Sequence, residues 1–131
     1  MKIKLMTIYV DDQEKALAFY TNVLGLVKKA DYTNGPYRWL TVQSAEEPEG
    51  TELQLAATTP AAKAFQQAQF ESNQPAMMFF TETLEADHDR MKAAGAAFTM
   101  PPTDVQYAWI AMLNDTCGNL VQITELKRWQ G

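Results

Sequence analysis

An internal repeat constrains this chain more strongly than any other feature of its sequence. Each half reads as one strand, one helix and three further strands. The corresponding positions are Gly25 and Gly95, Trp39 and Trp109, both 70 residues apart, and Gln54 and Gln122, 68 residues apart. Because repeats shorter than a stable domain bury their apolar faces against each other, we expect a single domain over residues 1–131. Module one covers 1–58, a connecting helix and linker cover 59–75, and module two covers 76–131.

The pattern of apolar residues places the elements of this repeat. Residues 2–10 alternate between apolar and polar, as in a strand, and Asp11 and Asp12 then supply a helix cap. The apolar helical stripe that begins at Ala16 ends at Gly25, which is typical of a helix C-terminus. Further strands are predicted at 26–30, 37–43, 51–57, 76–81, 97–100, 107–113 and 119–125. Helices are predicted at 60–70 and between Thr83 and Ala94, so the fold class is α+β.

The charged residues argue against several classes of partner. Eleven Lys and Arg against 16 Asp and Glu give a net charge of −5, with no basic cluster. Binding to nucleic acid needs clustered basic residues, so we expect no nucleic-acid partner. The longest apolar run, at 107–113, is far shorter than the roughly 20 residues of a membrane-spanning helix. Lys2 and Lys4 interrupt any signal-peptide core, so we expect no membrane partner and a cytoplasmic location.

The supply of metal-binding side chains is small. The chain has one Cys and one His. A single Cys rules out an intrachain disulfide and any multi-cysteine zinc site. A single His cannot supply two imidazoles to an iron or zinc ion. Cys117 falls in a predicted turn, Asp-Thr-Cys-Gly, with no obvious base partner, and a turn residue is favoured over a catalytic thiolate.

Two segments carry a resemblance to a known family. The segment VDDQEKALAFYTNVLGL and the closing segment NDTCGNLVQITEL resemble the vicinal oxygen chelate superfamily, which includes glyoxalases, bleomycin resistance proteins and extradiol dioxygenases. In the second segment, an Asp-Pro-Asp-Gly-Asn turn is more usual. The resemblance implies two βαβββ modules in tandem whose curved mixed sheets form an open cup. It also implies that a chain of this size forms a homodimer.

The resemblance also implies four positions for metal ligands. They fall on Leu5, Gln54, Ala76 and Gln122. Leu5 and Ala76 have no side-chain donor atom, and neutral amides are poor ligands for Fe or Zn. We therefore expect no metal and no cofactor, and we assign no catalytic residue, because neither Gln can accept a proton as the metal-bound Glu of a glyoxalase would.

Strand parity then selects the residues that line the cup, because alternate side chains face opposite sides of a sheet. The candidate ligand-binding residues are Leu5, Thr7, Tyr9, Trp39, Thr41, Gln54, Ala76, Met78, Trp109, Ala111 and Gln122. Such an apolar, aromatic-walled pocket is typical of a small-molecule site. The alternative that the two tryptophans lie in the core or in a dimer interface stays open. For the two glutamines, a structural role is favoured over ligand recognition.

Three functions remain in competition. The leading hypothesis is a metal-independent dimer that sequesters or senses a small molecule, aromatic or amphipathic in character. The acidic charge weakly favours a neutral or cationic ligand. The second hypothesis is a lyase, isomerase or dioxygenase-like enzyme with a metal held by non-standard ligands such as Glu52. The third is a structural or partner-binding dimer, in which residues 127–131 cover one edge.

Overall fold

The computed structural model describes residues 1–128. Module one contains β1 (Leu5–Val10), α1 (Gln13–Ala18), a π-helical turn η1 (Phe19–Val23), β2 (Val27–Asn34), β3 (Tyr37–Gln43) and β4 (Glu52–Ala57). The helix α2 (Pro60–Glu71) connects the modules. Module two contains β5 (Met77–Phe80), α3 (Leu84–Ala93), β6 (Ala97–Asp104), β7 (Ala108–Asn114) and β8 (Leu120–Leu126). The predicted succession of elements is confirmed in both halves.

Each module folds into one four-stranded mixed sheet. The strand orders are β1-β4-β3-β2 and β5-β8-β7-β6. In each sheet the first strand pairs in parallel with the last, and the other pairings are antiparallel. Both modules are therefore βαβββ units, and the fold is the predicted α+β glyoxalase-like fold. Strands β2 and β6 continue beyond the predicted ends at residues 30 and 100, because each runs on into a long hairpin with its neighbour.

The first helix of each module ends at a glycine, as the sequence predicts. Asp12 caps α1 by accepting a hydrogen bond from the Lys15 backbone N–H, at 3.0 Å. Gly25 and Gly95 have φ angles of 86° and 96°, in the left-handed region that glycine adopts without strain. In η1 the Leu24 N–H reaches back five residues to the carbonyl of Phe19, at 3.1 Å. This wider turn ends the helix with Phe19 buried and Tyr20 fully buried.

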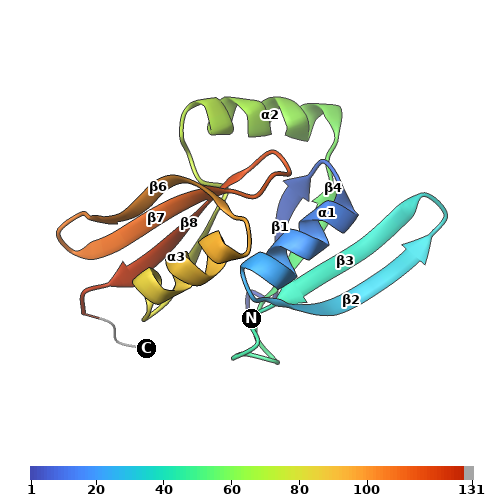
Figure 1. Ribbon diagram of the computed structural model, residues 1–131. Coiled ribbons are helices and arrows are strands. Elements are labelled where there is room, and N and C mark those ends of the chain that lie inside the picture. Colours follow the sequence, from blue (N-terminus) through green and yellow to red (C-terminus); the bar gives the residue numbers. More distant parts are fainter. Residues whose placement is uncertain (129–131) are drawn as a thin grey trace.

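One hydrophobic core joins the modules. It combines the helix-facing sides of both sheets with the buried sides of α1, η1 and α3. Figure 1 shows α1 and α3 beside each other, each lying across its own sheet. The Tyr20 ring lies 6.5 Å from the Phe79 ring, and Arg90 donates a hydrogen bond of 2.9 Å to the Val23 carbonyl. The helix-facing sides thus supply the core, although Met6 and Trp109 on these sides are 49% and 37% exposed. The opposite face of each sheet is here called its open face.

The strand register corrects the predicted alignment of the two modules. Thr41 pairs with Gln54 in module one, whereas Met112 pairs with Gln122 in module two. Directly paired residues share a face of a sheet. Thr41 is therefore equivalent to Met112 rather than to Ala111. A shift of one residue moves a strand's side chains to the opposite face, because the side-chain period of a strand is two.

Trp109 and Ala111 consequently do not lie on the open face, and their predicted place in the cup is wrong. Ala111 pairs with Ile123 and is fully buried in the core. Trp109 pairs with Glu125 on the same helix-facing side, near the end of its strand. The Lys127 ammonium lies 4.8 Å from the centre of the Trp109 ring. In module one the equivalent of Trp109 is Arg38, so the two tryptophans are not equivalent positions.

In the described part of the chain, no helix has the length and apolar character needed to cross a membrane. Most of the C-terminal segment predicted to cover an edge, residues 129–131, lies outside the described residues.

Candidate functional site

The open face of module one carries a short row of polar side chains. Thr7 and Thr41 flank Gln54 on neighbouring strands. The Thr7 hydroxyl donates to the Gln54 carbonyl oxygen at 2.9 Å. Among the described residues, the Gln54 amide nitrogen has no hydrogen-bond partner, so this row presents an N–H donor to whatever covers the face.

A carboxylate completes this row. Glu52 lies two residues before Gln54 on β4 and is half-buried. The hydroxyl of the fully buried Thr41 accepts a hydrogen bond from the Ala30 backbone N–H at 3.1 Å and donates to Glu52 Oε1 at 2.7 Å. Because the backbone N–H occupies the acceptor side of the hydroxyl, its single proton is directed at the carboxylate. The sheet therefore fixes the position of this negative charge.

Aromatic side chains lie beside the polar row, at the end away from Glu52. Trp39 shares the open face with Thr41, and Tyr32 lies directly opposite Trp39 on β2. Tyr9 and Leu5 occupy the same face of the edge strand β1 and are 41% and 40% exposed. Large apolar side chains left this exposed on one face indicate a surface that binds something.

The open face of module two differs in character. Gln122 lies between Met78 and Met112, and Met100 pairs with Met112 on the next strand. Gln122 donates to the Thr124 hydroxyl at 3.1 Å and lies 3.9 Å from the Met78 sulfur. Among the described residues it therefore leaves its carbonyl oxygen without a partner. Unbranched methionine side chains adapt to ligands of different shape, so this face is apolar and deformable.

The structure divides the predicted site residues into three groups. Six lie on the open face of module one, namely Leu5, Thr7, Tyr9, Trp39, Thr41 and Gln54. Met78 and Gln122 lie on that of module two, where Ala76 is exposed immediately before β5. Trp109 and Ala111 lie on the helix-facing side. The sequence reasoning missed Met112, Met100 and Tyr32, which become visible once strand pairing, rather than the position of the tryptophans, sets the alignment.

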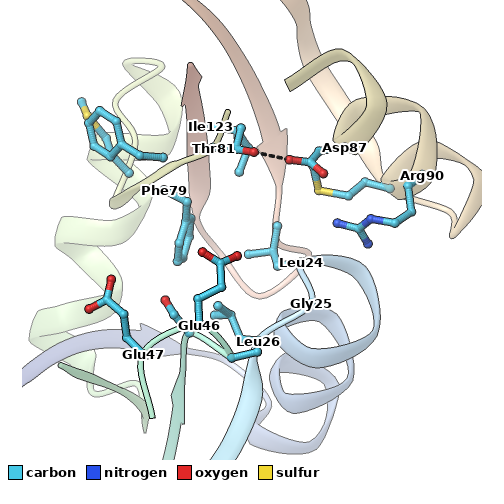
Figure 2. Close-up of a pocket in the computed structure, with 15 residues that line it drawn as sticks. Leu24, Gly25, Leu26, Glu46, Glu47, Phe79, Thr81, Asp87, Arg90 and Ile123 are labelled. Atoms are coloured by element: carbon cyan, nitrogen blue, oxygen red, sulfur yellow. Dashed lines mark hydrogen bonds between the residues drawn. The ribbon is translucent and has the colours of Figure 1, made fainter. Parts of the chain in front are cut away.

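A separate cleft of about 730 Å³ lies between the modules, near the end of β5. Its walls include Leu24, Phe79 and Arg90, and Glu46 projects into it from the β3–β4 loop (Figure 2). Only Met78 among the predicted cup residues borders this cleft. The cleft is therefore not the predicted cup.

The residues at the four metal positions do not fit a metal ion. Leu5 and Ala76 provide no donor atom, and both glutamines hydrogen bond to neighbouring side chains. Within residues 1–128, no group of three or more His, Cys, Asp or Glu side chains could hold a metal ion.

The predicted turn around Cys117 is a buried hydrogen-bonded junction between the modules. Asp115 is fully buried and accepts from the Tyr20 hydroxyl at 2.7 Å, from the Cys117 N–H at 2.7 Å and from the Asn119 amide at 2.8 Å. Burial, reinforced by the Asp115 charge, raises the pKa of the Cys117 thiol to about 12. A thiol with this pKa remains protonated at neutral pH and is a poor nucleophile, which agrees with a structural role.

Comparison with known proteins agrees with this geometry. A family model described as the Glyoxalase/Bleomycin resistance protein/Dioxygenase superfamily matches residues 2–123. The chain belongs to this superfamily. One relative is the uncharacterized protein YurT of Bacillus subtilis (strain 168), which is 43% identical over 126 residues, covering 95% of this chain and 99% of YurT.

Solved structures of the superfamily share the whole fold. UcmS2 superimposes with a TM-score of 0.82 and 29% identity, covering 95% of this chain and 97% of UcmS2. TnmS3, an antibiotic binding protein from Streptomyces sp. CB03234, has a TM-score of 0.78 and 25% identity, covering 97% of both chains. The superfamily fold thus carries a small-molecule-binding protein among the structural neighbours of this chain.

Proposed function

We propose that this protein is a metal-independent, small-molecule-binding member of the superfamily, whose ligand is aromatic or amphipathic. The observation that supports the proposal is the character of the two open faces. They combine exposed aromatic and methionine side chains with a few amides, hydroxyls and one carboxylate, whereas the helix-facing sides supply the apolar core. A few fixed polar groups among apolar side chains are typical of small-molecule sites. The structural neighbour TnmS3, an antibiotic binding protein, also supports the proposal of small-molecule binding.

We further propose that the ligand cup forms between two copies of the chain. Within one chain both sheets use their helix-facing sides to build the common core, which leaves their open faces at the surface. Tyr9, Met78 and Phe80 are 41%, 51% and 52% exposed on the edge strands β1 and β5. If the open face of module one packs opposite that of module two from a second copy, these side chains are covered. Such an interface also places the amide nitrogen of Gln54 and the amide oxygen of Gln122 in one cavity.

A thermal-shift screen of aromatic compounds, at fixed protein concentration and with chelator present, tests the proposal. A ligand that binds only the folded protein raises Tm, because it adds about 2.7 kcal/mol to the free energy of unfolding at a ligand concentration 100 times its Kd. We expect several aromatic compounds to raise Tm with chelator present. We expect Gln122→Leu to weaken the effect. Thr116→Ala, on an exposed turn outside both faces, is the matched control.

Light scattering of the same samples tests the assembly. A mass of twice 14.7 kDa is expected at micromolar concentration. A monomer that binds ligand would contradict the two-copy cup. A screen in which no compound raises Tm would contradict ligand binding itself, and a Tm that rises only with added divalent metal would favour the metal-dependent enzyme instead.

A further inference from the structure

Glu52 is a negative charge that has no positive partner among residues 1–128. The one other acidic residue in the strands of this sheet is paired: Asp31 forms ion pairs with Lys28 and Arg38, at 3.5 and 2.9 Å. Arg38 also pairs with Glu14 of α1. In residues 1–128 no Lys, Arg or His side chain forms an ion pair with Glu52. Glu52 is nevertheless half-buried and held by Thr41. Removing a carboxylate from water is costly unless a positive charge or hydrogen bonds offset the loss.

The open face that carries Glu52 suits a cation with an aromatic body. The cross-strand pair of Trp39 and Tyr32 lies on this face too, and the register places Gln54 between the carboxylate and Trp39 along the strands. Aromatic faces attract cations, and they also stack with aromatic ligands. One sheet face thus offers a fixed negative charge together with aromatic side chains.

The equivalent positions of module two are apolar. Thr41 pairs with Gln54, and Met112 pairs with Gln122, so Met112 is the counterpart of Thr41. Two residues before each glutamine, Leu120 is the counterpart of Glu52. Across a two-copy cup, a polar and charged face therefore meets a methionine face. The chain as a whole carries a net charge of −5, which disfavours anionic ligands.

We propose that the ligand of this protein is an organic cation with an aromatic or amphipathic body, and that Glu52 is the residue that selects its positive charge. This inference rests on the proposed function, because it names the ligand class of the same surface. Glu52 acts by accepting N–H bonds from, or lying against, the positive group, while the methionine face covers the apolar part.

Three indole compounds with different charges test the inference, measured by isothermal titration calorimetry at low salt. Tryptamine is a cation at neutral pH, tryptophol is neutral, and indole-3-propionate is an anion. We expect tryptamine to bind at least about tenfold more tightly than tryptophol, and indole-3-propionate to bind most weakly. In Glu52→Gln the preference for tryptamine over tryptophol should fall to within about twofold, with tryptophol affinity unchanged.

Two matched variants and one charge reversal control the experiment. Glu49→Gln removes an exposed carboxylate from the nearby loop and Glu46→Gln removes one from the cleft, and both should keep the preference for tryptamine. Glu52→Lys should reverse the order, so that indole-3-propionate binds more tightly than tryptamine. Circular dichroism and Tm establish that each variant is folded.

Each failure has its own meaning. If tryptophol binds the unmodified protein as tightly as tryptamine, or if tryptamine fails to bind at millimolar concentration while neutral aromatic compounds raise Tm, the cation inference is wrong and the proposed function stands. If Glu46→Gln rather than Glu52→Gln removes the preference, the cation lies in the cleft and Glu52 is not its partner. If no compound of any charge binds or raises Tm, the proposed function itself fails.

Discussion

Modules one and two share their topology but use two equivalent regions in different ways. The turn before β8 is buried and ties the modules together through Asp115, whereas the loop before β4 is exposed and borders the cleft. The open face of module one carries Glu52 and hydroxyls, whereas that of module two carries methionines. The modules thus share their order of strands and helices but differ both in the turn that joins them and in the chemistry of their open faces.

The largest expected effect is on the free energy of unfolding, and it should distinguish the turn before β8 from the loop before β4. Asp115→Ala removes a buried carboxylate and leaves the Tyr20 hydroxyl and backbone N–H groups without partners. We expect the free energy of unfolding to fall by about 3–5 kcal/mol, measured by urea unfolding. Glu46→Ala in the equivalent exposed loop should change it by less than about 0.5 kcal/mol. Equal effects at the two positions would show that the Asp115 turn does not hold the modules together.

A smaller loss of stability is expected when the Tyr20 hydroxyl, which donates a hydrogen bond to Asp115, is removed. Tyr20→Phe should lower the free energy of unfolding by about 1–3 kcal/mol at pH 7, because Asp115 loses a buried donor. Burial, reinforced by the neighbouring Asp115 charge, holds the pKa of Tyr20 well above its ordinary value of 10.0. The unfolded chain therefore releases this proton first as pH rises, and the stability falls above about pH 10. Urea unfolding between pH 8 and 11 should show a steeper loss for the unmodified protein than for Tyr20→Phe. Parallel losses would contradict the assignment.

The smallest expected effect is on tryptamine affinity, and it should differ between the two tryptophans. Trp39 lies on the open face and Trp109 on the helix-facing side. We expect Trp39→Ala to weaken tryptamine binding by about tenfold, which corresponds to about 1.4 kcal/mol. Trp109→Ala should leave the Kd within about twofold, although it removes the ring that Lys127 contacts. Calorimetry on both variants gives the comparison. A larger loss of affinity in Trp109→Ala than in Trp39→Ala would contradict a ligand site on the open face.

The sequence was sufficient for the fold because periodicity, caps and glycines act locally. Asp12 and Gly25 bound the first helix, and both modules show the same succession of elements. It was sufficient for the open face of module one, where Thr41 and Gln54 do share a face. It failed for β7. The matching Trp39 and Trp109 suggested that equivalent residues of β3 and β7 are 70 positions apart. Thr41 pairs with Gln54 and Met112 pairs with Gln122, so the equivalent residues are in fact 71 positions apart. Register is set by how paired strands are joined: the turn between β7 and β8 is shorter than the loop between β3 and β4, so matching single residues by their spacing along the chain missed this one-residue shift.

The proposed ligand site lies on the open faces rather than in the cleft. Methyl NMR of the protein labelled at its seven methionines tests it most directly. Met100 and Met112 lie on the open face of module two, whereas Met91 is 2% exposed and borders the cleft. On addition of tryptamine, we expect the methyl signals of Met100 and Met112 to shift while that of Met91 stays in place. A shift of Met91 with Met100 and Met112 unmoved would place the ligand in the cleft and contradict the proposed site.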